Sequence, residues 1–203
     1  MKVVQILTPN FSNISNLNEP ELGANEKMTL VQVIIGDITQ DFQINATLAD
    51  NAKLDVHTAI LARNKSNIKY NYNVEHCGVN SVSNFDLVSS LSGQSHKETN
   101  MTIHFCKGAI GACGNEKEMV ILADRARNIS YPIIDCDEEN VVGNHSLSSG
   151  HIDESQLEYL RIRGFSEEQA RNIITRARIL DILNLIDDDD KLQYVYEALN
   201  EQK

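Results

Sequence analysis

The chain has 203 residues, 41% of them hydrophobic and 23% charged, and carries a formal net charge of -11. This length allows one ordinary domain with a buried core, or one domain with a small appendage. The acidic balance argues against nucleic acid and anionic membrane surfaces as partners. No apolar run approaches the ~20 residues that span a bilayer. The segment 1–9 has too short an apolar stretch for a signal peptide, so we expect a cytoplasmic protein.

The first two thirds of the chain are predicted to form β-strands. The segment 11–27 is rich in Asn and Glu and predicts a loop. From Met28 to about Cys136, short runs in which apolar and polar residues mostly alternate predict strands with one buried face. The clearest runs are 30–35, 42–48, 54–61, 68–74, 101–105 and 119–122.

These runs recur roughly every 10–14 residues, with Gly, Asn and Asp between them. Nothing between them is long and periodic enough to be a helix, which excludes a βαβ pattern. A sandwich, a barrel and a β-helix all remain, and periodicity alone does not decide among the three. Aromatic residues are scarce at 5%, with no Trp, so the core must be mainly aliphatic.

After Gly150 the pattern becomes helical. Asp153 is expected to cap one helix, which Gly164 ends, and Ser166 to cap the next. The apolar face of the second helix is predicted from Ala170, Ile173, Ile174, Ala177 and Leu180. A last helix presents Leu192, Val195, Tyr196 and Leu199. We therefore divide the chain into a β-domain at 1–148 and a helical segment at 149–203.

The segment 144–164 reads NHSLSSGHIDESQLEYLRIRG. It resembles the C-terminal signature of the SufB/SufD proteins, which take part in iron–sulfur cluster assembly. The matching residues are His145, Gly150, Asp153, Gln156, Leu157, Tyr159, Leu160, Arg163 and Gly164. The segments 123–126 and 132–135 are similar to strand turns of that family. The likeness is dense from Asp124 to Ala170 and weaker back to about Met28.

The resemblance implies a right-handed parallel β-helix core with a small C-terminal α-helical tail. It also implies a non-catalytic scaffold that pairs with a second SufB/SufD-like subunit, as a homodimer or heterodimer. Full-length family members carry an N-terminal helical domain, for which this chain has no room. A SufC-type ABC ATPase would dock on the helices through Leu157, Tyr159, Leu160 and Arg163. Glu158 replaces the Phe usual in the family, which removes an apolar anchor.

His145 falls on the family histidine proposed to ligate a transient iron–sulfur cluster, and imidazole is a suitable iron ligand. The two family cysteines fall at Gly143 and Lys117, so both thiols are missing. Cys136 is the nearest thiol and a weaker candidate ligand. His76 also matches a family position, and there we expect a structural hydrogen bond.

Two other functions remain open at this stage. The chain could be a degenerate, structural SufD-like subunit that binds no cluster itself. A β-helix enzyme acting on carbohydrate is a distant alternative, because there is no Trp platform and no convincing acid pair. The four cysteines (Cys77, Cys106, Cys113 and Cys136) form no C-x-x-C pair, so we expect four free thiols in a reducing compartment.

Overall fold

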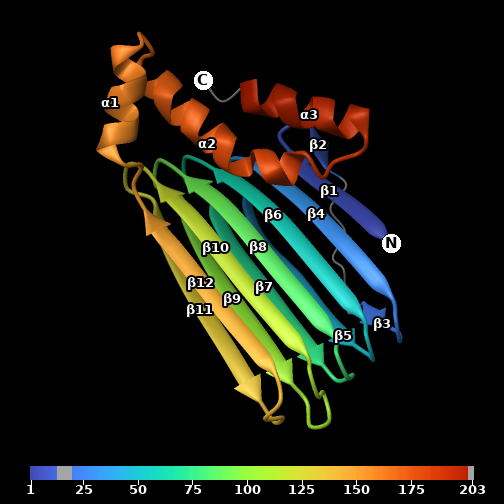
Figure 1. The fold of residues 1–203 in the computed structure, drawn as a ribbon. Helices are drawn as coiled ribbons and strands as arrows, with labels where there is room; N and C mark the ends of the chain where they lie inside the picture. The colour runs from blue at the N-terminus through green and yellow to red at the C-terminus, as the bar shows by residue number, and fades with distance from the viewer. Residues whose placement is uncertain (13–19, 201–203) are drawn as a thin grey trace.

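The computed structural model describes residues 1–12 and 20–200, and its main feature is two parallel β-sheets stacked face to face (Figure 1). The seven-stranded sheet has the order β12-β10-β8-β6-β4-β1-β2, and the five-stranded sheet the order β11-β9-β7-β5-β3. From β4 onward the chain alternates between the sheets, so each strand pairs in parallel with the strand after next. This is a parallel β-solenoid, and the predicted β-helix core is confirmed.

The bounds of the elements follow. The seven-stranded sheet contains β1 (Lys2–Thr8), β2 (Phe11–Ser12), β4 (Lys27–Gly36), β6 (Lys53–Ala62), β8 (Val82–Leu91), β10 (Cys113–Leu122) and β12 (Val142–Gly150). The five-stranded sheet contains β3 (Glu21–Leu22), β5 (Thr39–Leu48), β7 (Asn67–His76), β9 (His96–Phe105) and β11 (Arg127–Cys136). The helices are α1 (Glu154–Ile162), α2 (Glu167–Leu183) and α3 (Asp189–Asn200).

The core between the sheets is built from the inward residues of each strand. Every second residue of β5, β7 and β9 is buried there, as the alternating sequence pattern predicted. Four aromatic rings form one stack across the interior, from Phe42 through Tyr70 and Phe85 to Tyr72. Aliphatic side chains fill the remaining space, in keeping with the low aromatic content.

Asn, Asp and Gly between the strands serve the turns of the solenoid. Asn25, Asn51 and Asn80 occupy corresponding positions in successive turns, and all three have positive φ values of 55–64°. Their backbone N–H groups donate to the next turn along. Asn adopts this left-handed conformation at lower cost than most residues, which explains why it recurs at these corners.

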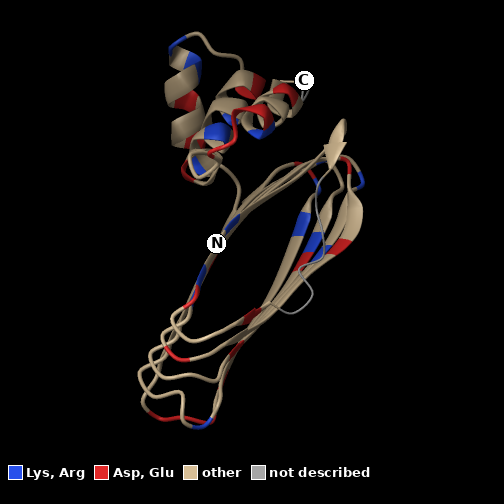
Figure 2. Ribbon diagram, turned by 90° about the vertical axis from the view of Figure 1, so that its right-hand side faces the viewer, with Lys and Arg blue, Asp and Glu red and all other residues tan. Residues whose placement is uncertain are grey.

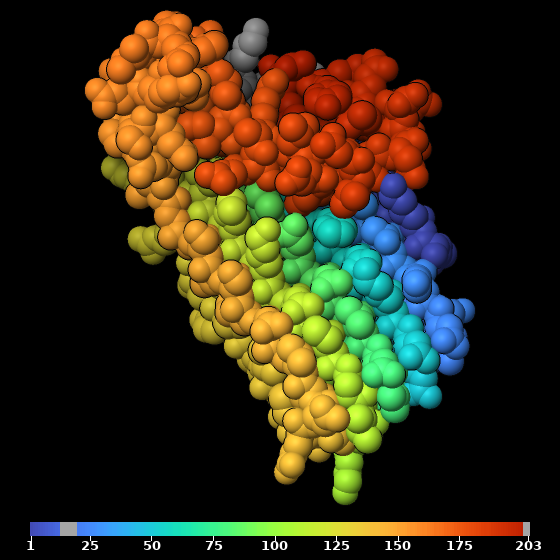
Figure 3. All heavy atoms as spheres, viewed as in Figure 1, coloured from blue at the N-terminus to red at the C-terminus, as the bar shows by residue number. Residues whose placement is uncertain are grey.

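The helices cover one end of the seven-stranded sheet on its outer face (Figures 1 and 3). Val31, Val33 and Ile35 of β4 point outward there and pack against α2 and α3, while Leu30 and Ile34 point into the solenoid. Both faces of β4 are therefore buried, which explains its nearly continuous apolar sequence. In edge view the helices lie to one side of the paired sheets, near one end of the strands (Figure 2).

The predicted apolar face of α2 was wrong. Ile173 and Leu180 are 39% and 45% exposed, whereas Ile179, Ile182 and Leu183 pack on the sheet together with Val195 and Leu199 of α3. The predicted apolar positions run along most of α2, whereas the residues that pack on the sheet lie in its last turns and outside that predicted set. Ala170 alone of the predicted face is fully buried.

The helix boundaries agree with the sequence. Asp153 caps α1, Ser166 forms a capping box with Gln169, and Gly164 has a φ of 92°. Strand β12 continues to Gly150, two residues past the predicted end of the β-domain. Within the predicted loop 11–27, β2 and β3 form two-residue strands, and residues 13–19 lie outside the described residues. None of the described helices is long and apolar enough to cross a membrane.

A ladder of amides crosses the outer face of the seven-stranded sheet. Asn144 donates to Asn115 (2.8 Å), Asn115 to Asn84 (2.9 Å) and Asn84 to Asp55 (2.7 Å). Each Asn thus links its own strand to the preceding one. Such ladders stabilise stacked in-register strands in addition to the backbone hydrogen bonds.

The substitution Asn115→Ala should lower the free energy of unfolding by about 1–3 kcal/mol, because it removes two of these hydrogen bonds from the middle of the ladder. Urea denaturation measures the change. Asn67→Ala is the matched control, since Asn67 is an exposed strand residue outside the ladder. Equal losses for the two variants would show that the ladder adds nothing.

Candidate functional site

The solenoid is open at the end formed by β11 and β12. Strand β11 pairs only with β9 and β12 only with β10, so the outer backbone edge of each has no neighbouring strand among the described residues. In Figure 3 β12 runs along this margin of the molecule. Large apolar side chains are exposed on both strands: Ile129, Tyr131, Ile133, Ile134, Val142 and Leu147. This end therefore presents unpaired backbone groups and apolar surface together.

His145 lies on β12 beside Glu116 of β10, to which it is paired in register. Its Nδ1 atom lies 3.4 Å from Glu116 Oε2. The Glu116 side chain is fully buried, whereas that of His145 is 21% exposed. Neither His145 Nδ1 nor either carboxyl oxygen of Glu116 forms a hydrogen bond within the described chain. A buried carboxyl group and a partly exposed imidazole thus face each other at the open end, and neither has a hydrogen-bond partner at the facing atoms.

Burial, and then the nearby charge of Glu118, raises the pKa of Glu116 to about 8. We therefore take Glu116 as largely protonated at neutral pH, and its contact with His145 as a close approach and not an ion pair. Glu118 has a cation of its own, since the fully buried Lys97 donates to its Oε1 atom. Thr99 also donates to Oε1, at 3.3 Å. Lys97 is thus already paired with Glu118.

The positions of the two missing cysteines show why no thiol reaches His145. Gly143 faces Ile134 across the solenoid, and a Cβ atom at Gly143 would lie 2.9 Å from Ile134 Cγ2. A cysteine there would clash unless Ile134 moved. Lys117 points to the opposite side of β10, where its side chain is 61% exposed and 3.7 Å from Asp86. Neither position therefore carries a ligand toward the histidine.

Cys136 and His145 are not brought together. Cys136 follows Ile134 by two residues, toward the turn between β11 and β12. His145 follows Gly143 by two residues, away from that turn. Each is roughly 6–7 Å along its strand from the Ile134–Gly143 contact. Among the described residues no group of three or more His, Cys, Asp and Glu is arranged to hold a metal ion. His145 and Cys136 remain predictions as cluster ligands, and they cannot act as a pair in this arrangement.

His76 has a structural position. It is fully buried, its Nδ1 and Nε2 atoms each lie 2.8 Å from a serine hydroxyl, of Ser81 and Ser83, and its ring stacks on Phe105. Burial lowers its pKa to about 4. Both ring nitrogens are occupied, so His76 has no lone pair free for a metal ion.

The four residues predicted to bind a partner, which lie on α1 or at its C-terminal end, differ in their exposure to solvent. Leu157 is buried and Leu160 partly so, whereas Tyr159 is 57% exposed and Arg163 stacks on its ring at 3.7 Å. The sequence reasoning missed Ile162, which is 79% exposed. Phe165, just beyond α1, is also exposed. In the sequence, the sign of this exposed apolar surface was an isoleucine flanked by two arginines. Partner binding by α1 stays a prediction, with Tyr159 and Arg163 on its accessible face.

The raised pKa of Glu116 gives a pH-dependent stability. The folded chain holds the Glu116 proton up to about pH 8. The stabilisation that comes from this more tightly held proton is therefore complete below the ordinary pKa of 4.5 and is lost as pH rises through about 8. Glu116→Gln cannot titrate. The free energy of unfolding of the wild type, taken relative to this variant, should fall by up to about 1.4 kcal/mol per pH unit in that window. Urea denaturation across the window measures it, with Glu158→Gln as an exposed control.

Comparisons with known proteins identify the family. The SufBD core domain of the SUF system for iron–sulfur cluster assembly matches residues 3–178. An iron–sulfur cluster assembly SufBD family protein of Synechocystis is 27% identical over 164 residues, covering 80% of this chain and 34% of that protein. The iron–sulfur cluster assembly protein SufD of Bacillus subtilis is 32% identical over 69 residues, 34% of this chain and 16% of that protein. The chain thus spans about a third of the length of the first relative and less of the second. Since the family match covers most of the chain, the protein belongs to the SufBD core family of the SUF system for iron–sulfur cluster assembly.

Proposed function

We propose that the chain is a scaffold subunit of the iron–sulfur cluster assembly machinery and not an enzyme. It pairs through its open end with a second SufB/SufD-like chain, and it binds a SufC-type ABC ATPase through α1. The nascent cluster is the cargo, and His145 is its ligand from this chain. The observation that carries the proposal is the contact between His145 and Glu116, whose facing atoms form no hydrogen bond. This contact lies at the end of the solenoid where the strand edges have no neighbouring strand among the described residues.

The open end supports pairing on energetic grounds. Unpaired strand edges with exposed apolar side chains favour association with another sheet, because the backbone groups gain partners and the apolar surface leaves water. Tyr131 and Ile133 on β11, with Val142 on β12, are each about half exposed. A matching chain placed against both edges would cover them and would enclose His145.

The cluster ligands that one chain can offer at this end also support a second subunit. One chain offers an imidazole and a carboxyl group at this end but no thiol within reach, since Gly143 and Lys117 stand at the family cysteine positions. Iron–sulfur clusters are held mainly by thiolates, with histidine as an occasional replacement. A cluster at His145 therefore requires the paired chain to supply the thiolates.

The second candidate function is a structural subunit that pairs in the same way but never touches the cluster. The packing of Ile134 in the space beside Gly143 favours this candidate, because that space cannot hold a thiol without rearrangement. The two candidates share the partners and differ only in the role of His145.

Anaerobic reconstitution of the co-expressed pair with iron and sulfide separates them. If His145 is a ligand, His145→Ala should remove most of the visible charge-transfer absorbance while the pair stays intact on size-exclusion chromatography. His151→Ala is the matched control, because His151 lies just beyond β12 and its Nδ1 is 2.8 Å from the Leu122 carbonyl oxygen. Unchanged absorbance in the His145→Ala pair would select the structural subunit.

Docking of the ATPase is tested on the accessible face of α1. Tyr159→Asp combined with Ile162→Asp should abolish co-purification with the SufC-type ATPase of the source organism, since both side chains are more than half exposed and the change does not touch the core. Leu157→Asp is unsuitable, because Leu157 is buried and its loss would destabilise α1.

Glu158→Phe is the reciprocal variant, and it should strengthen the complex by restoring the apolar anchor usual in the family. Circular dichroism confirms that each variant keeps its helices. Undiminished co-purification of the Tyr159→Asp/Ile162→Asp protein would remove α1 as the docking element.

A further inference from the structure

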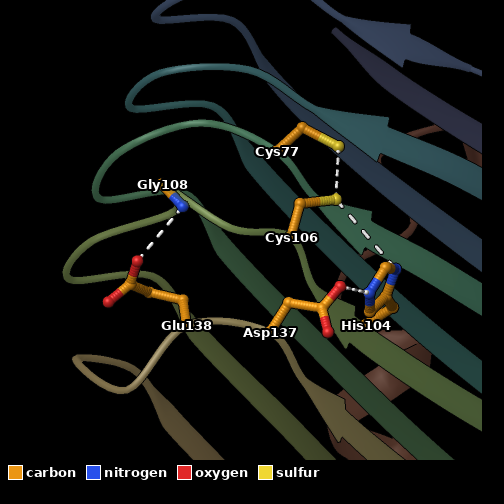
Figure 4. Close-up of polar contacts among 6 residues, drawn as sticks. All are labelled: Cys77, His104, Cys106, Gly108, Asp137 and Glu138. Atoms are coloured by element: carbon orange, nitrogen blue, oxygen red, sulfur yellow. Dashed lines mark hydrogen bonds and ion pairs between the residues drawn. The ribbon is translucent and has the colours of Figure 1, made fainter.

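Two cysteines lie side by side at the turn that follows the five-stranded sheet, outside the site described above (Figure 4). Cys77 follows β7, Cys106 follows β9, and their Sγ atoms are 2.8 Å apart. The Cys106 amide donates to the His76 carbonyl oxygen, so the parallel ladder continues to this level. Adjacent strands are about 4.8 Å apart, which lies within the Cα separation that a disulfide requires.

A histidine and a carboxylate are arranged around Cys106. His104 Nδ1 lies 4.0 Å from Cys106 Sγ, and His104 Nε2 lies 3.2 Å from Asp137 Oδ2 (Figure 4). An ionised carboxylate only accepts hydrogen bonds, so Nε2 carries the proton and the Nδ1 lone pair faces the thiol. This is the geometry of a base oriented by a third group toward a nucleophile.

The two thiols differ in their environment. Partial burial, and then the hydrogen bond to Cys106, raises the pKa of Cys77 to about 12. Cys106, in contrast, has His104 beside it as a base. Both sulfurs are accessible, since Cys77 is exposed and Cys106 partly exposed. A reagent from solution can therefore reach the pair.

The other two cysteines lack this arrangement. Cys113 Sγ lies 3.5 Å from the side-chain amide of Asn115, and Cys136 is exposed at the end of β11. Neither is in contact with another cysteine, and neither has a histidine beside it. The same chain thus supplies its own control thiols.

We propose that Cys77 and Cys106 are a redox-active dithiol that forms a reversible disulfide by exchange with low-molecular-weight disulfides, with Cys106 as the attacking thiol, Cys77 as the resolving thiol and His104 as the base. The bond would link the turn containing β7 to the turn containing β9. This inference does not depend on the proposed function.

The exchange balances in two steps. His104 takes the Cys106 proton, and the thiolate attacks one sulfur of a disulfide RSSR, which forms Cys106–S–SR and expels RS⁻. Cys77 then loses its proton to solvent and attacks the Cys106 sulfur, which closes the Cys77–Cys106 bond and expels the second RS⁻. The two released thiolates take up the proton held by His104 and one proton from solvent. The two cysteines lose two electrons and two protons, and RSSR becomes two RSH.

The test uses the full chain carrying Cys113→Ser and Cys136→Ser, incubated with oxidised glutathione and followed by intact-mass and peptide mass spectrometry. We expect loss of two hydrogen atoms, a Cys77–Cys106 cross-link and its reversal by dithiothreitol. Adding Cys77→Ser should trap a stable glutathione adduct on Cys106, because the resolving thiol is gone. His104→Gln should slow the first step roughly tenfold or more without preventing the cross-link.

The wild-type chain, treated in the same way, should give the same cross-link, with Cys113 and Cys136 outside it. Thermal unfolding of each variant confirms that the fold is retained. Stable glutathione adducts on both Cys77 and Cys106 without a cross-link would overturn the proposal. An unchanged reaction rate in His104→Gln would overturn the assignment of His104 as the base.

Discussion

The architecture depends on the way a parallel solenoid satisfies its backbone. Each turn donates and accepts hydrogen bonds with the turns on both sides, so the interior turns are complete and the end turns are not. Near its first strands this chain adds a short antiparallel strand, β2, and packs α3 over β1 and β4, while α2 lies against β6 and β8. The end formed by β11 and β12 has no comparable cover among the described residues, and the exposed apolar side chains gather on these strands.

The polar groups inside the solenoid are satisfied to different degrees. Near the first strands, Gln32 donates to Gln5 at 2.7 Å and accepts from Thr58 and Tyr70, so these four side chains form one buried network. At the open end, Glu116 and His145 face each other with no hydrogen bond. Buried polar groups normally form hydrogen bonds, and those that do not need an explanation such as a functional role. The hydroxyl groups of Ser89 and Ser95 are also buried without a hydrogen-bond partner, so what distinguishes Glu116 and His145 is that they face each other at the open end.

Much of the fold could be predicted from the sequence. Strands β5 and β7 alternate clearly, and the caps at Asp153 and Ser166 are local signals that no tertiary contact overrides. Strand β12 is mainly Ser, Asn and Gly, with few β-branched residues, so its sequence did not predict a strand; one amide link, from Asn144 to Asn115, joins its outer face to β10. The buried face of α2 was missed because the sheet contacts only its C-terminal half. His145 was identified through the family signature, but Glu116 was not, since only the register of β10 against β12 places a lone glutamate beside it.

The proposed binding surface for a second SufB/SufD-like chain is the β11–β12 end. Hydrogen–deuterium exchange of the chain, alone and in the presence of that partner, distinguishes this end from every other surface. We expect the amides of 127–150 to exchange quickly in the isolated chain and to become protected on addition of the partner, while those of β4 and β6 stay protected throughout. Complex formation that leaves 127–150 unprotected and protects another surface would contradict it.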